Sequence, residues 1–223
     1  YKQMTGNIIS ATKVEPAGPF EDSAASGVWN LQDQYDYRRG GNWPETGNAL
    51  SRGLFMGGQT GSDRIDTIQS VNLASDGNAV DFGDLSKGEG ALLGAAVGSF
   101  IRGVHAGGFP STTDVIEFVN FATTGDATDF GDLSAANFGL TACSNGTRGL
   151  FAGGKAPSNP TDTIDYITIA NTGDATDFGN LSEAKYYAGA LASPTRGVFA
   201  GSQNNSNAYV NTMEYVTIGS TGN

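Results

Sequence analysis

A single repeat dominates this sequence and limits the folds that it can adopt. The segment Asp81–Leu85 (DFGDL) returns as Asp129–Leu133 and, with one change, as Asp177–Leu181, so successive copies begin 48 residues apart (129 − 81 and 177 − 129). A second marker, Arg-Gly followed by apolar residues and a glycine pair or Gly-Ser, starts at Arg52, Arg102, Arg148 and Arg196. A third marker, an alternating apolar and polar run, starts at Thr67, Val115, Thr163 and Thr212. Three markers with one period indicate a repeat architecture in which each unit buries its faces against its neighbours.

Each repeat is predicted to consist of strands alone. Residues 163–170 alternate with period two, which indicates a strand with one buried face. Residues 187–193 are small and apolar, residues 197–201 form an apolar run closed by Gly-Ser, and residues 175–181 make a short further strand. No segment has a sustained helical period. Four strands in about 48 residues match a propeller blade, whose repeats run to roughly 40–50 residues.

The repeat resembles the kelch repeat in two features. An apolar strand ending in Gly-Gly is followed by an alternating strand that carries an aromatic residue such as Tyr166 or Tyr215. Kelch blades usually place a Trp after this Tyr, whereas here neither Trp29 nor Trp43 lies inside a repeat. The resemblance implies an all-β, kelch-like β-propeller over residues 46–223, built from about four four-stranded repeats, in a ring that is incomplete or completed between molecules.

The repeat count leaves the closure of that ring open. The Arg-Gly marker occurs four times, but the Phe-Gly element occurs three times, and a fourth copy would begin near Asn223. The segment Phe20–Ala25 echoes Phe130–Ala136 and could close the ring from the other end. The alternatives are a longer chain with more blades, or blades shared between subunits.

The region before the repeats, residues 1–45, is predicted to be an extended lead-in and connector. Within it, Ser26–Tyr35 (SGVWNLQDQY) and Gly41–Pro44 (GNWP) resemble a segment of bacteriophage virion proteins, where it precedes glycine-rich or kelch-like repeats in tail-fibre-like chains, notably of marine phages. The resemblance implies a virion structural protein, tail-fibre-like or a peripheral decoration, located on the extracellular particle. Its implied partners are other virion proteins, further copies of itself, and a host cell-surface glycan or protein. The alternative is a cellular or secreted kelch-like propeller that binds glycan or protein.

The charge balance excludes some classes of partner. Lys and Arg number 12 against 23 Asp and Glu, a formal net charge of −11. Nucleic acids and anionic membranes both need cationic partners, so neither is expected to bind, and no apolar run approaches the roughly 20 residues that span a bilayer. The one cysteine, Cys143, forms no intrachain disulfide and is expected to be a buried packing residue.

The residues that could carry chemistry have structural explanations as well. The only histidine, His105, replaces the Phe of the sister repeats, and we expect it to hold a packing position. The repeated arginines are expected to bond carbonyls or an acid at blade junctions. The repeated acids could offer oxygen ligands to Ca²⁺, but their spacing fits no calcium loop, and we favour bonding to turn backbone: Asp126, Asp129, Asp132, Asp174 and Asp177. We therefore expect a binding or structural module rather than an enzyme, with no cofactor.

Binding is expected where the repeat fails to repeat. The connections 59–64, 109–113, 155–161 and 203–210 differ in length and sequence, and equal blades should present them on one face. Variable loops on a rigid scaffold commonly carry binding, although neutral drift would look similar. The candidate residues are Gln59, Ser62, Arg64, Phe109, Lys155, Asn159, Gln203, Asn205 and Tyr209.

Overall fold

The structure, a computed structural model, describes residues 52–221 except 62, 74–75, 87–91, 110–111 and 158. The chain divides into two compact units, Tyr1–Ser51 and Arg52–Asn223, and the second unit contains all the described residues. The predicted lead-in and connector, with both tryptophans and the segment Phe20–Ala25, lie outside the described residues. No helix in the described part of the chain is long and apolar enough to cross a bilayer.

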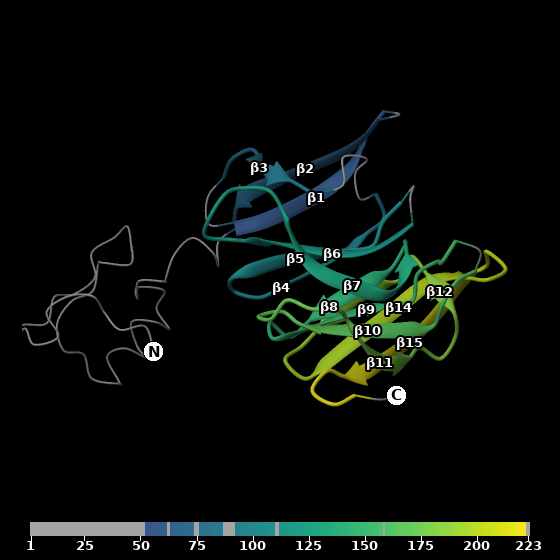
Figure 1. Cartoon of the computed structure of the whole chain (residues 1–223). Coiled ribbons are helices and arrows are strands. Elements are labelled where there is room, and N and C mark those ends of the chain that lie inside the picture. Colours follow the sequence, from purple (N-terminus) through teal and green to yellow (C-terminus); the bar gives the residue numbers. More distant parts are fainter. Residues whose placement is uncertain are drawn as a thin grey trace, which may run out of the picture. The chain divides into compact units, whose positions relative to one another are not determined.

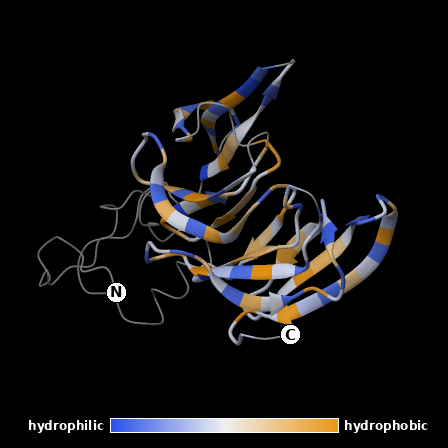
Figure 2. Ribbon diagram, turned by 45° about the vertical axis from the view of Figure 1, so that its right-hand side comes forward, coloured by the Kyte–Doolittle hydropathy of each residue, from blue (hydrophilic) through white to orange (hydrophobic). Residues whose placement is uncertain are grey.

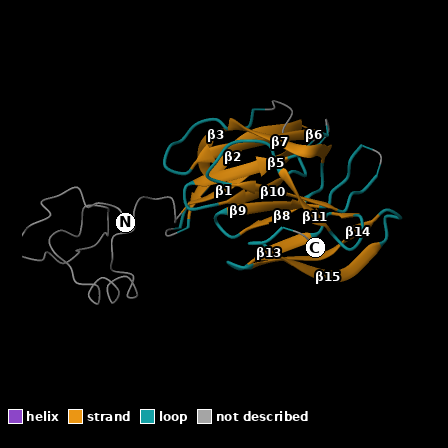
Figure 3. Cartoon of the chain, turned by 60° about the horizontal axis from the view of Figure 1, so that its bottom comes forward, coloured by secondary structure: helices purple, strands orange, loops and turns teal. Residues whose placement is uncertain are grey.

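The described residues form fifteen strands in four antiparallel sheets and no helix (Figure 3). We call the sheets blades 1–4, and in Figure 1 they follow one another from the blue end of the colour scale to the yellow end.

Blade 1 contains β1 (Arg52–Thr60), β2 (Asp63–Asn72) and β3 (Val80–Asp84). Blade 2 contains β4 (Ala95–Gly98), β5 (Arg102–Ala106), β6 (Thr113–Asn120) and β7 (Thr128–Asn137). Blade 3 contains β8 (Thr141–Ser144), β9 (Arg148–Ala152), β10 (Thr163–Thr168) and β11 (Thr176–Asn180). Blade 4 contains β12 (Lys185–Tyr186), β13 (Gly189–Ala192), β14 (Arg196–Asn204) and β15 (Tyr209–Thr217).

The blades have one plan with differences at the two ends. Blades 2 and 3 each have four strands in sequence order, as the repeat predicts. Blade 1 has three strands, and in blade 4 the central strand β14 pairs with β15 on one edge and with β13 and β12 on the other. The predicted all-β, propeller-like arrangement of blades is therefore present, and the described residues do not close it into a ring.

The connections predicted to be loops are partly strand. In the end blades, Gln59 lies in β1 and Arg64 in β2, while Gln203 lies in β14 and Tyr209 in β15. Strand pairing continues past a register shift at the glycines, so these hairpins stay paired almost to their tips. In blades 2 and 3, by contrast, the equivalent segments keep only isolated bridges at Phe109 and Lys155.

A recurring bulge turns one phenylalanine into the core in each of blades 1, 2 and 3. In blade 2 the pairing of β6 with β7 shifts between Ile116 and Glu117, which leaves Phe130 as the extra residue. Phe130 is 2% exposed, and Phe82 and Phe178 are equally buried at the same bulge in blades 1 and 3. A bulge can re-aim a side chain in this way, so the Phe of the DFG marker serves packing.

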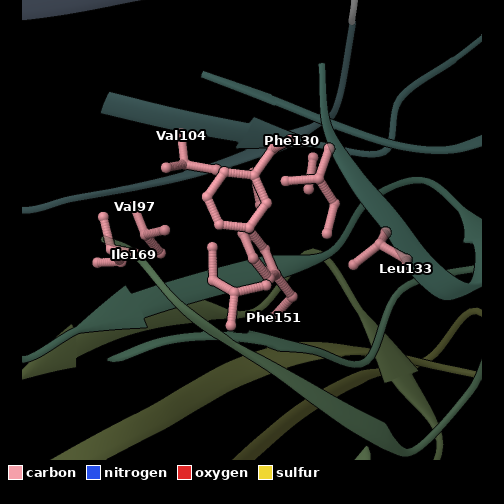
Figure 4. Close-up of a cluster of buried hydrophobic side chains, with 10 residues drawn as sticks. Val97, Val104, Phe130, Leu133, Phe151 and Ile169 are labelled. Carbon is pink, nitrogen blue, oxygen red and sulfur yellow. The ribbon is translucent and has the colours of Figure 1, made fainter. Parts of the chain in front are cut away.

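The hydrophobic core lies between blades. Between blades 2 and 3, the side chains of Val104 and Phe130 meet Phe151 and Ile169 from the next sheet (Figure 4). Separate clusters fill the junctions of blades 1 and 2 and of blades 3 and 4. Hydrophobic and hydrophilic residues alternate along many strands (Figure 2), as the period-two pattern predicts.

Backbone hydrogen bonds join the outer strand of one blade to the next blade. At the junction of blades 2 and 3, Gly173 N donates to Phe130 O (2.7 Å) and Ala175 N donates to Asp132 O (2.8 Å). The Asp132 amide in turn donates to Asp174 Oδ1 (3.1 Å). Blades 1 and 2 repeat the set with Phe82, Asp84 and Asp126. The repeated acids Asp126 and Asp174 therefore bond backbone, as favoured above, although the backbone belongs to the preceding blade.

Three of the four repeated arginines also sit at these junctions, which confirms the predicted structural role for Arg52, Arg102 and Arg148. Arg148 Nη1 donates to Ile218 O of blade 4 (2.8 Å), and its guanidinium lies 4.4 Å from the Tyr166 ring centroid. Arg102 donates to Ile169 O (3.1 Å) and Arg52 to Phe121 O (2.7 Å), each in the following blade. A charged donor bonded to a carbonyl and stacked on a ring adds direction to an otherwise apolar junction.

Candidate functional site

Cationic and aromatic side chains form a continuous row across the ends of blades 1–4. The Arg64 guanidinium lies 5.4 Å from the centroid of Phe109, whose ring is 5.2 Å from that of Phe138. Phe138 and Lys155 exchange backbone hydrogen bonds of 2.7 and 3.2 Å. We call the following six residues the cation–aromatic row: Arg64, Phe109, Phe138, Lys155, Tyr186 and Tyr187.

The row continues into blade 4 through two tyrosines. Lys155 Nζ lies 5.4 Å from the Tyr186 ring centroid, and the Tyr186 and Tyr187 rings are 4.7 Å apart. The Tyr186 hydroxyl donates to Asn207 Oδ1 (2.5 Å), so a residue of the β14–β15 turn holds this ring. Tyr186 is buried while Tyr187 is 45% exposed, so Tyr186 packs beneath the surface and Tyr187 presents its ring to solvent.

Tyr187 occupies a strained backbone position that recurs in the neighbouring blades. Its φ is 58°, and the equivalent residues Leu93 and Gly139 have φ of 63° and 65°. These three residues are linked in series, because Gly139 N donates to Leu93 O (2.7 Å) and Tyr187 N donates to Gly139 O (2.9 Å). Left-handed geometry suits glycine and costs a tyrosine of the order of 1–3 kcal/mol, so Tyr187 lowers the stability of the fold at this position.

The Tyr187 ring lies directly over glycine. A Cβ placed on Gly139 would come within 2.7 Å of Tyr187 Cε1. Burial and the neighbouring Tyr186 both raise the pKa of the Tyr187 phenol, so the hydroxyl stays protonated and can donate a hydrogen bond. The site thus combines a fixed aromatic face with polar groups at its edge.

The structure brings together some of the residues that the sequence predicts for binding. Arg64, Phe109 and Lys155 belong to the row, and Gln203 pairs in register with both Tyr186 and Tyr209. The remaining candidates are more peripheral. Gln59 donates to Gly61 O in its own hairpin (2.8 Å), Asn159 and Asn205 are exposed, Tyr209 is 86% exposed, and Ser62 lies outside the described residues.

Three members of the row were not predicted from the sequence. Phe138 precedes β8, Tyr186 ends β12, and Tyr187 follows it at the start of the run 187–193, which the sequence predicts to be a small apolar strand. Alignment of the repeats carries a signal for them, since Leu92, Phe138 and Tyr186 are large apolar residues at one shared position. The alignment cannot show that these residues lie near Phe109 and Lys155, because Phe109 and Lys155 belong to other connecting segments of the chain.

A separate cavity of about 410 Å³ is lined by residues of β1, β4, β5 and β8. His105 and Cys143 are its titratable lining groups besides Arg52. Burial lowers the pKa of His105 to about 4 and raises the pKa of Cys143 to about 11, so both are neutral at neutral pH. Both are buried, as predicted, and His105 takes the position that Phe151 and Phe199 hold in the next blades.

The buried Asp165 and the partly buried Glu214 each have their own partners and do not form a common site. Asp165 accepts hydrogen bonds from Ser134 N (3.0 Å) and Ser134 Oγ (2.7 Å), and burial raises its pKa despite these bonds. Glu214 pairs with buried Lys185; burial alone would raise the pKa of Glu214, but its hydrogen bonds to Lys185 and Ser182 lower it overall. Within the described ranges, no three His, Cys, Asp or Glu side chains are grouped so as to hold a metal ion.

Comparison with known proteins yields a likeness of fold. No family model and no curated protein matches the chain. A solved structure described as "Structure of YjhT" superposes with a TM-score of 0.57 and 14% sequence identity over 69% of this chain. The chain spans about half of that protein's length, 49%. At this identity the likeness concerns the fold alone.

Proposed function

We propose that this chain is a bacteriophage virion protein, tail-fibre-like or a peripheral decoration, whose blades present the cation–aromatic row to a glycan on the host surface. The observation that carries the binding proposal is the row itself, six residues from four blades joined by ring and cation–ring contacts and, between Phe138 and Lys155, by backbone hydrogen bonds. The assignment to a virion is supported by the resemblance of Ser26–Tyr35 and Gly41–Pro44 to virion segments.

A glycan suits the chemistry of this surface. Sugar rings have a face of C–H groups and a rim of hydroxyl groups, which match an aromatic face and nearby hydrogen-bonding groups. Tyr187 and Tyr209 supply exposed rings, while the loops at Asn159 and Asn205 supply exposed amides. Because the chain carries a net charge of −11, an uncharged glycan approaches it without the repulsion that a polyanion would meet.

The row is also held in place before any ligand arrives. Backbone hydrogen bonds fix Phe138 to Lys155, and the Tyr186 hydroxyl is tied to Asn207. Side chains that are already ordered lose little entropy on binding, which favours affinity for a small ligand. The order of these loops therefore supports the proposed binding role, as their chemistry does.

Substitution of Tyr187 by glycine tests the binding proposal without removing a structural residue. The variant Tyr187→Gly relieves the left-handed strain, as Gly139 does in blade 3, and deletes the exposed ring. After a glycan-array screen identifies a ligand, we expect Tyr187→Gly to bind the soluble oligosaccharide roughly tenfold more weakly, a loss of about 1.4 kcal/mol. Surface plasmon resonance with the chain immobilised at low density gives this monovalent affinity.

Leu93→Gly is the matched control, because it relieves the same strain in blade 2 and removes no aromatic ring. Its affinity should equal that of the wild-type chain. A screen without any glycan hit, or equal loss in both variants, would contradict the proposed site. For the virion assignment, purified particles from the producing host should contain the chain by mass spectrometry; its presence on cells or in medium without particles would favour a cellular or secreted propeller.

A further inference from the structure

The exposed face of blade 4 has apolar residues at the positions that blade 3 uses for its junction with the next blade. In blade 3, the residues Cys143, Leu150 and Ile164 face blade 4 and are 6%, 0% and 0% exposed. Strand pairing places Leu191, Val198 and Met213 at the same positions of blade 4. Leu191 is 64% exposed and Met213 is 73% exposed. The face that blade 3 buries is therefore open in blade 4.

The open face of blade 1 has the opposite half of this design. Phe151 and Phe199 pack against the preceding blade and are 1% and 0% exposed. The equivalent residue of blade 1, Phe55, is 60% exposed. Leu73 is 68% exposed, whereas its equivalents Ile169 and Ile218 are both fully buried. Blade 1 thus carries the apolar surface that, in blades 3 and 4, fits a preceding blade.

The same two faces also carry the groups that make the polar contacts of a junction. Arg196 stacks over Tyr215 at 4.6 Å, as Arg148 stacks over Tyr166 at 4.4 Å. Arg148 completes its junction by donating to Ile218 O of the next blade. The residue equivalent to Ile218 in blade 1 is Leu73, so its carbonyl is the acceptor that matches Arg196.

We propose that blade 1 of one copy of this chain docks on blade 4 of a second copy and forms there a fourth junction of the kind seen between its own blades. Phe55 of the second copy fills the space over Val198 and Met213, and Arg196 donates to the second copy's Leu73 carbonyl. A second copy is the occupant because its blade 1 carries the same Arg-Gly marker and apolar strand that blades 2, 3 and 4 present to their predecessors.

The contact joins two different faces and is therefore heterologous, so it closes into a ring only if the rotation between copies closes. Two copies joined at both ends supply eight blades, twice the four described here, which is the upper end of the usual four to eight. We therefore expect a closed dimer. Closure would remove both open faces from water, which an end-to-end chain of copies would not.

Mass measurements on two complementary variants test this contact. The wild-type chain should have twice its 23.0 kDa mass in multi-angle light scattering. Phe55→Asp disables the blade 1 face and Met213→Asp disables the blade 4 face, so each variant alone should be monomeric. Because each retains the face that the other lacks, an equimolar mixture should recover dimers, held by one intact junction.

A monomeric wild-type chain would overturn the proposal, since another segment or another protein would then be the occupant of these faces. Dimers formed by either variant alone would also overturn it, because they would require an isologous contact. Failure of the mixture to recover dimers, with both variants shown to be folded by circular dichroism, would exclude the pairing of these two faces.

Disulfide trapping reports on the register of the contact. At the junction of blades 3 and 4, a Cβ on Gly197 would lie 2.7 Å from Cys143 Sγ. The equivalent pair across the proposed contact is Gly53 with Leu191, so a Gly53→Cys, Leu191→Cys chain should form covalent dimers under mild oxidation. The control Gly61→Cys, Leu191→Cys places one thiol in an open hairpin turn and should not crosslink. Equal crosslinking of both pairs would contradict the proposed register.

This contact stands apart from the proposed glycan site. Phe55→Asp and Met213→Asp should leave monovalent glycan affinity unchanged, and Tyr187→Gly should leave the dimer mass unchanged. Loss of one activity therefore leaves the other measurable, and the two proposals fail separately.

Discussion

At the scale of single residues, one strand position shows how the repeat tolerates variation. Phe151 and Phe199 hold it in blades 3 and 4, and His105 holds it in blade 2 with 4% of its surface exposed. His105 Nδ1 lies 3.9 Å from Glu117 Oε1, which is too long for a hydrogen bond. Burial without such a bond disfavours the protonated imidazole, and this is why the pKa of His105 falls to about 4.

This shift predicts a dependence of stability on pH. The unfolded chain takes up a proton on His105 near pH 6.5, while the folded chain resists until about pH 4, so stability should fall as the pH drops between these values. The full loss is of the order of 3 kcal/mol. His105→Phe should flatten the free energy of unfolding over this interval, as measured by urea denaturation at a series of pH values.

His105→Gln is the companion variant, since it keeps a polar side chain that does not titrate. It should show the same flattened profile even if its overall stability is lower. A wild-type slope that persists in both variants would mean that other groups cause it and that the pKa of His105 does not differ between the folded and unfolded chain.

At the scale of elements, the glycine of the DFG marker permits the approach of adjacent blades. Gly131 has a φ of 146°, and a Cβ on it would overlap the Gly173 backbone of blade 3. The hydrogen bonds from Gly173 and Ala175 depend on this approach. The repeated pattern is thus explained by contact between backbones and by the buried Phe130.

Gly131→Ala should therefore destabilise the protein by about 3 kcal/mol or more, from backbone strain together with forced separation of blades 2 and 3. Gly125→Ala separates these causes, because Gly125 has a similar φ of 151° but nothing within 4 Å of an added Cβ. It should cost only the strain, roughly 1–2 kcal/mol. Thermal unfolding of the two variants gives the comparison, and equal losses would show that crowding at the junction contributes nothing.

At the scale of the whole unit, stability is expected to be graded along the series of blades. Blades 2 and 3 have a neighbour on each face, while blades 1 and 4 each keep one open face among the described residues. In repeat proteins stability is approximately the sum of the intrinsic stability of each unit and the contacts with its neighbours. The end blades should consequently open more often than the central ones.

Hydrogen exchange followed by mass spectrometry can measure this gradient. In dilute solution, amides of β5 and β9 should exchange more slowly than those of β1 and β15. Protection of β1 and β15 should rise with protein concentration as the proposed dimer forms. Uniform protection at every concentration would contradict both the gradient and the open faces.

Sequence alone determined the period and the all-strand nature of the repeating units, because backbone periodicity and turn chemistry are local properties. It predicted the strands, the buried Cys143, the packing role of His105 and the junction role of Arg148. The cation–aromatic row was decided only by tertiary structure, since Phe138 and Lys155 become neighbours through the docking of separate connections. The same holds for the open faces of Phe55 and Met213, because a strand pattern specifies that a face is apolar but not whether another blade covers it.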